Sequence, residues 1–194
     1  PRVQLAGLQL NPVLRSPAQP YAFDGLTIQH IPTGKHQPIA LPESDGIRNL
    51  RWSPSGDLLA FTLDQPDGVE LWVADLVQGT AQRLTEPRLN NTYGAPCRWI
   101  SDADGLLCKF LPADQGAPPV PASVPRGPRV EQNLGRTAPA RTYTNLLDNP
   151  EDEALFEYYL TSTLMQVTMT GDRIPLTEPQ LIASATASPD GERI

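Results

Sequence analysis

Three groups of residues in this chain are of types that could do chemistry: two cysteines, two histidines and a run of arginines. Cys97 and Cys108 are the only cysteines. A hairpin that pairs Ile100 with Gly105 places the cysteines directly opposite each other, close enough for a disulfide. Two buried thiols that only fill space fit the same pattern. No metal site is expected, because no third and fourth ligand of the usual kind lies near them.

The arginines gather in residues 126–141, a segment with a single acid, Glu131, in a chain whose formal net charge is −7. One interpretation is a solvated surface loop. The other is a rim that faces anions, because the guanidinium fork matches the geometry of a carboxylate. The four residues are Arg126, Arg129, Arg136 and Arg141.

No catalytic centre is predicted. The histidines, His30 and His36, share one predicted hairpin, and His30 alternates with apolar residues, which favours the polar face of a strand. The sequence has no Gly-x-Ser-x-Gly elbow, phosphate-binding loop or dinucleotide fingerprint. Acidic residues at 102–104 and 190 resemble parts of calcium loops, but turn chemistry explains them. We therefore expect no catalytic residue, no cofactor and no metal.

The elements that must position these residues are repeated hairpins. A strand–turn–strand pattern at residues 49–62 recurs at 97–110 and at 185–194. In the first copy Pro54 sets φ for a type I turn, and Gly56 supplies the positive φ that closes it. Leu59 and Phe61 then alternate with small or polar residues, which is the period of a half-buried strand.

A second type of hairpin alternates with the first. It occupies residues 26–41, 69–84 and 164–176. Two hairpins in each period of about 40–50 residues predict a four-stranded blade, the unit of a β-propeller. The expected fold is therefore all-β: a partial β-propeller of four-stranded blades, with a Pro-rich loop and a short helix inserted.

The predicted organisation has two parts. Residues 1–22 form an N-terminal arm, loosely structured over its first twenty residues, and residues 23–194 form about three blades. An insertion at 111–160 holds the Pro-rich segment 112–128 and a helix at 150–159, which Asn149 caps and Pro150 begins. The last repeat stops just after its turn, so we expect a piece cut inside a blade, and an open arc of blades.

The acidic balance argues against nucleic acid and against anionic membrane surfaces as partners. No apolar run approaches the length of about 18 residues that spans a bilayer.

Several segments resemble a known family. Residues 47–56 (IRNLRWSPSG) and 69–76 (VELWVADL) are general to many propellers. Residues 105–108 (GLLC), 116–119 (GAPP) and 140–147 (ARTYTNLL) are more specific, and 152–159 (DEALFEYY), followed by Ser162 and Leu164, is the most specific. Together they resemble the prolyl oligopeptidase family of serine peptidases, in its glutamyl endopeptidase-like branch, over about residues 5–194.

The resemblance implies a serine peptidase with a β-propeller and an α/β-hydrolase domain. Only the propeller part is matched, so no residue of the Ser-Asp-His triad is carried over. The expected function is non-catalytic: the propeller limits which peptides reach the hydrolase domain, which is absent here. If the parent enzyme prefers an acidic residue before the cleaved bond, Arg141 is the candidate within this chain to meet that carboxylate, and a cationic group of the hydrolase domain is an equal alternative. The alternative is a stand-alone propeller scaffold or ligand-binding module. A periplasmic or secreted location is expected for a bacterial source, with the chloroplast stroma as the alternative.

Overall fold

The computed structural model describes residues 2–18, 21–101, 104–120, 147 and 149–194. Its central element is a four-stranded antiparallel sheet with strands in sequence order. The eight residues of the second strand pair with all eight of the third. These strands are β6 (Gly46–Trp52), β7 (Leu58–Gln65), β8 (Gly68–Asp75) and β9 (Thr80–Arg83).

A second antiparallel sheet has the same order of neighbours. Its third strand is long enough to pair with one strand near its C-terminal end and with another near its N-terminal end. The strands are β10 (Cys97–Ser101), β11 (Gly105–Phe110), β12 (Thr161–Val167), β13 (Arg173–Pro175) and β14 (Gln180–Leu181).

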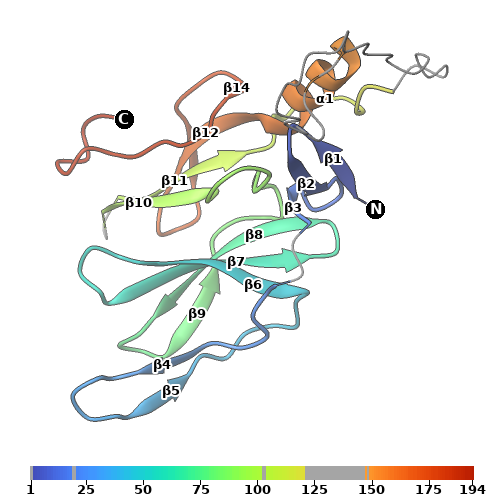
Figure 1. Cartoon of the computed structure of the whole chain (residues 1–194). Helices are drawn as coiled ribbons and strands as arrows, with labels where there is room; N and C mark the ends of the chain where they lie inside the picture. The colour runs from blue at the N-terminus through green and yellow to red at the C-terminus, as the bar shows by residue number, and fades with distance from the viewer. Residues whose placement is uncertain (1, 19–20, 102–103, 121–146, 148) are drawn as a thin grey trace, which may run out of the picture.

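The central sheet lies between two other layers (Figure 1). One face packs on the second sheet, through a cluster that includes Val69, Leu71, Leu106 and Phe110. The other face packs on a hairpin of β4 (Thr27–Gln29) and β5 (His36–Pro38), through a cluster that includes Phe61. Because side chains alternate along a strand, β7 and β8 supply apolar groups to both clusters.

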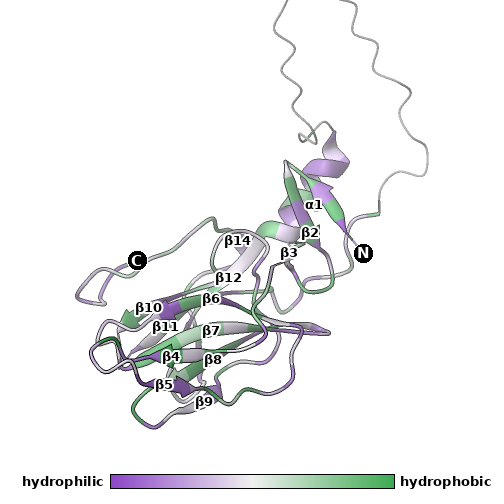
Figure 2. Ribbon diagram, turned by 60° about the horizontal axis from the view of Figure 1, so that its bottom comes forward, coloured by the Kyte–Doolittle hydropathy of each residue, from purple (hydrophilic) through white to green (hydrophobic). Residues whose placement is uncertain are grey.

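The N-terminal residues differ from the loosely structured arm that we predicted. They form a three-stranded antiparallel sheet of β1 (Val3–Leu5), β2 (Leu8–Asn11) and β3 (Ser16–Pro17). This sheet packs against helix α1 (Pro150–Leu160), at one end of the molecule and beside the stacked sheets (Figures 1 and 2). The alternating Leu8 and Leu10 gain a partner only when the distant helix arrives, so the local sequence gave too weak a signal.

Hydrogen bonding confirms the repeat of the first turn. The Ser53 N–H donates to the Leu58 carbonyl (2.9 Å), and the Leu58 N–H donates to Ser53 Oγ (3.1 Å). Ser188 and Arg193 make the same two bonds, at 2.8 and 3.0 Å. The strands predicted around the last turn do not form, however. Residues 192–194 are exposed and pair with no strand among the described residues.

The all-β prediction and the short helix are confirmed; the helix begins at Pro150 with Asn149 as its N-cap. Within the part of the chain that the structure describes, the sheets close neither a barrel nor a propeller.

The β10–β11 hairpin has the predicted register at the cysteines and a different one at its turn. Cys97 pairs with Cys108, and the structure joins them in a disulfide with a Cα–Cα distance of 4.2 Å. Closer to the turn, Gly105 pairs with Ser101, so the predicted pairing with Ile100 is wrong. A bulge at Ile100 takes up the extra residue.

Both half-cystines belong to the cluster between the two sheets, where they are 6% and 0% exposed. Reduction should therefore lower the free energy of unfolding. Closing a loop of 11 residues contributes about 3 kcal/mol on a chain-entropy estimate. Urea unfolding of the oxidised chain, the reduced chain and a Cys97→Ala/Cys108→Ala variant measures this difference. Addition of reductant should leave the double variant unchanged, and an oxidised chain no more stable than the reduced one would contradict the expectation.

Candidate functional site

Most residues with predicted roles do not converge on one site. Arg141 and the other three arginines of its segment lie outside the described residues. His30 and His36 are exposed on the β4–β5 hairpin, where His30 Nδ1 lies 2.8 Å from Thr33 Oγ1. Asp104 and Asp190 accept hydrogen bonds within their own turns. Among the described residues, no three His, Cys, Asp or Glu side chains are placed to hold a metal ion.

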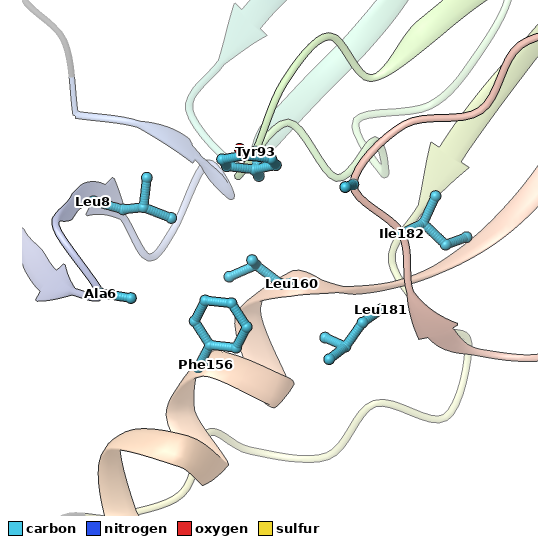
Figure 3. Close-up of a pocket in the computed structure, with 8 residues that line it drawn as sticks. Ala6, Leu8, Tyr93, Phe156, Leu160, Leu181 and Ile182 are labelled. Atoms are coloured by element: carbon cyan, nitrogen blue, oxygen red, sulfur yellow. The ribbon is translucent and has the colours of Figure 1, made fainter. Parts of the chain in front are cut away.

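The structure instead forms an apolar hollow of about 410 Å³ where four distant segments meet (Figure 3). They are the β1–β2 turn, helix α1, the segment around β14, and the linker between the two large sheets (residues 84–96). We call this cavity the apolar hollow. It is lined by Ala6, Leu8, Tyr93, Phe156, Leu160, Leu181, Ile182 and Ala183.

Helix α1 supplies one wall of the apolar hollow. Its first turn is closed by the Asn149 side chain, whose Oδ1 accepts from the Asp152 N–H at 2.8 Å. Near its end the helix is held by Arg15, which is 8% exposed. The Arg15 guanidinium lies 4.4 and 4.8 Å from the ring centres of Tyr158 and Tyr159, within cation–π range. These contacts fix the helix against the N-terminal sheet.

The linker supplies the opposite wall, and hydrogen bonds hold it to the helix. Asn90 Nδ2 donates to the carbonyls of Tyr159 and Thr161, both at 3.0 Å. The Asn91 N–H donates to the Arg15 carbonyl at 2.9 Å. A polar linker can be buried here because these groups are paired. The next aromatic residue, Tyr93, remains 47% exposed and lines the apolar hollow.

Lys109 joins two walls of the apolar hollow from behind. It is 4% exposed, and its Nζ donates to the carbonyls of Tyr93 and Ala183. No carboxylate among the described residues forms an ion pair with it. Burial, and to a smaller extent the nearby charge of Arg98, lower the pKa of the Lys109 ammonium to about 8.

We did not predict this site from the sequence. The one local signal is a lysine inside the apolar run of β11, whose six residues are all buried. A lysine in such a strand must find carbonyl or carboxylate partners, but the sequence does not say where they come from. The walls are mostly apolar, and the residues that line the apolar hollow include no Asp, Glu, His, Lys or Arg.

The chain was compared with known proteins. It is 29% identical over 205 residues to "Probable glutamyl endopeptidase, chloroplastic" of Oryza sativa subsp. japonica. It is also 29% identical over 203 residues to a protein of the same name in Arabidopsis thaliana. The chain is related in sequence to peptidases. Each match covers 98% of the chain, which spans about a fifth of the length of these relatives. No family model matches the chain.

Among the described residues, no helix is long and apolar enough to cross a membrane.

The lowered pKa of Lys109 predicts how stability depends on pH. The group keeps its proton up to pH 8 in the folded chain and up to about 10.5 when unfolded. Between these values the unfolded chain binds more protons, so the free energy of unfolding should rise with pH, by at most about 1.4 kcal/mol per pH unit. Below pH 8 this group should contribute no slope. Urea unfolding at intervals from pH 7 to 10.5 measures this dependence of the free energy of unfolding on pH.

Lys109→Met should remove this rise in the free energy of unfolding. The free energy of unfolding of wild type minus that of the variant should therefore increase from pH 8 to 10.5. Lys35→Met changes the other lysine, which is exposed. Its free energy of unfolding should depend on pH in the same way as that of wild type. Parallel curves for Lys109→Met and wild type would show that the ammonium is not desolvated in the folded chain.

Proposed function

We propose that this chain is the non-catalytic portion of a serine endopeptidase, and that it forms part of a β-propeller. In this proposal the propeller controls the access of peptides to an α/β-hydrolase domain elsewhere in a longer protein. The observation that carries the proposal is the match to two proteins named glutamyl endopeptidase, which covers 98% of the chain but only 22% and 21% of the relatives.

Two features of the fold support the propeller. Consecutive segments form antiparallel sheets with the same order of four neighbouring strands, as blades do. The turns Gly34, Gly79 and Gly171, all with positive φ, recur at spacings of 45 and 92 residues. These spacings correspond to one and two repeats of a blade.

The side chains of the described residues support the idea that catalysis takes place in another part of the longer protein. Both histidines are exposed on one hairpin, and among the described residues neither is hydrogen-bonded to a serine or cysteine. We propose a periplasmic or secreted location for a bacterial source, with the chloroplast stroma as the alternative; the names of both relatives include the word chloroplastic.

A fluorophosphonate probe, which reacts with activated serines, tests the proposal. A longer protein that contains this chain should be labelled and should cleave short peptides after glutamate, whereas the 194-residue chain should do neither. Folded substrates with the same cleavage sequence should be cleaved far more slowly than short peptides. A longer protein with no labelling and no cleavage would instead support the alternative, a stand-alone propeller scaffold or binding module.

We also propose that Arg141 meets an acidic substrate side chain, since arginine matches a carboxylate and the chain is otherwise acidic. In the longer protein, Arg141→Ala should lower kcat/KM for peptides with glutamate before the cleaved bond by about tenfold or more, and should affect glutamine peptides much less. Arg126→Ala, in the same arginine-rich segment, is the matched control. An equal loss for both peptides would contradict the role.

A further inference from the structure

We propose that β4 and β5 are the outer half of a blade, and that its two inner strands come from a distant part of the longer protein. The inner strands would pair with the free edge of β4 and cover Trp52. The existence of a longer protein rests on the proposed function, whereas the surface that would bind the strands lies on this chain. The chain spans about a fifth of the length of the relatives that it matches, so proteins of that length have ample sequence for two further strands.

The β4–β5 hairpin is equivalent to the third and fourth strands of the two larger sheets, which are β8–β9 and β12–β13. In all three hairpins, the residue five places after the turn glycine donates its N–H to a leucine carbonyl on the opposite strand. The register of the three hairpins is therefore the same at this bond, and β4 and β5 correspond to the last two strands of a four-stranded sheet. The three bonds join Ile39 to Leu26 (2.9 Å), Leu84 to Leu71 (2.8 Å) and Leu176 to Leu164 (2.9 Å).

One edge of β4 has no strand beside it in the part of the chain that the structure describes. Leu26 and His30 form backbone hydrogen bonds with the β5 side of the hairpin. Because successive residues of a strand bond in opposite directions, the N–H and C=O groups of Thr27 and Gln29 point to the free edge. The same edge of β8 pairs with β7 along its whole length, and that of β12 pairs with β11. The repeats of the chain thus indicate that a strand is the partner of this edge.

The face of the central sheet that receives the hairpin is only partly covered. Phe61 of β7 belongs to the cluster shared with the hairpin and is 0% exposed. Trp52 of β6 pairs with Leu59 of that cluster and so lies on the same face, yet it is 57% exposed. It lines a hollow of about 380 Å³ together with Ile28 and Gln29 of β4. Two outer strands therefore leave open the part of the face that two inner strands would cover.

Trp99 is the counterpart of Trp52 in the second sheet, and it has the contact that Trp52 lacks. Each tryptophan follows an arginine in the first strand of its sheet. Trp99 packs against the cluster between the two large sheets, and its Nε1 donates to the Arg51 carbonyl at 3.0 Å. Arg51 belongs to β6, the first strand of the preceding sheet. The first of the proposed inner strands would supply the equivalent carbonyl to Trp52.

The central sheet also indicates what kind of strands would fit. Val73 of β8 and Ile28 of β4 lie the same distance before their turn glycines, and Val73 pairs with Ala60 of β7. The strand beside β4 should therefore place a small apolar residue opposite Ile28. It should follow a turn like that at residues 53–56 (SPSG), since this turn precedes β7. The proposed partner is thus a hairpin of the first type, bound by main-chain pairing at the edge of β4.

Hydrogen exchange followed by mass spectrometry tests the proposal, by comparing the 194-residue chain with a longer protein that contains it. The N–H groups of Thr27 and Gln29 should exchange rapidly in the 194-residue chain and at least about 100-fold more slowly in the longer protein. The matched controls are Ala81 and Arg83, whose N–H groups face the outer edge of β9 and should exchange rapidly in both proteins. Equally rapid exchange of Thr27 and Gln29 in both proteins would overturn the proposal. Slow exchange in the 194-residue chain that depends on its concentration would overturn it too, by assigning the edge to a second copy.

Trp52→Ala and Trp99→Ala give a second measurement. In the 194-residue chain, Trp99→Ala should lower the urea midpoint, whereas Trp52→Ala should leave it unchanged because that side chain is mostly in water. In the longer protein, Trp52→Ala should speed exchange at Thr27 and Gln29 by about tenfold or more. Unchanged exchange there would contradict the proposed cover of Trp52. No cleavage is measured: a longer protein that protects β4 without fluorophosphonate labelling would keep this inference and contradict the peptidase function.

Discussion

The burial of both faces of β7 and β8 is the constraint on which the rest of the structure depends. Leu59, Phe61 and Leu63 of β7 face the β4–β5 hairpin, and Val69 and Leu71 of β8 face the second sheet. Each of these side chains is at most 1% exposed, and burial of one such group is worth about 1.5–3 kcal/mol. A single sheet could not bury both faces, so the outer layers are needed for the central one to be stable.

Stacking the sheets forces polar backbone into the interior, and this shapes the candidate site. The linker between the sheets must pass beneath helix α1, so its peptide groups need partners that water would otherwise supply. Asn90 and Lys109 meet that need from the linker and from β11. The same bonds hold the backbone of Tyr93, whose side chain remains exposed at the apolar hollow.

The surface of the apolar hollow carries no charged side chain. Its walls are mostly aliphatic and aromatic, with the accessible side chain of Tyr93 among them. The similarity to proteins named glutamyl endopeptidase covers 98% of the chain and about a fifth of those relatives.

The sequence by itself determined the local structure. Period-two alternation marked the strands of the central sheet, Pro54 and Gly56 marked the repeated turn, and Asn149 with Pro150 marked the start of the helix, because each signal acts within a few residues. The pairing of Cys97 with Cys108 followed from counting residues outward from the expected hairpin turn, whereas the bulge at Ile100 did not follow from it. The tertiary structure alone decided that residues 3–17 form a sheet, that Arg15 lies against the tyrosines of α1, and that Lys109 holds Tyr93 and Ala183. The contacts of Arg15 and Lys109 join residues 16 to 144 positions apart, and no local pattern records which distant partner a buried polar group will find.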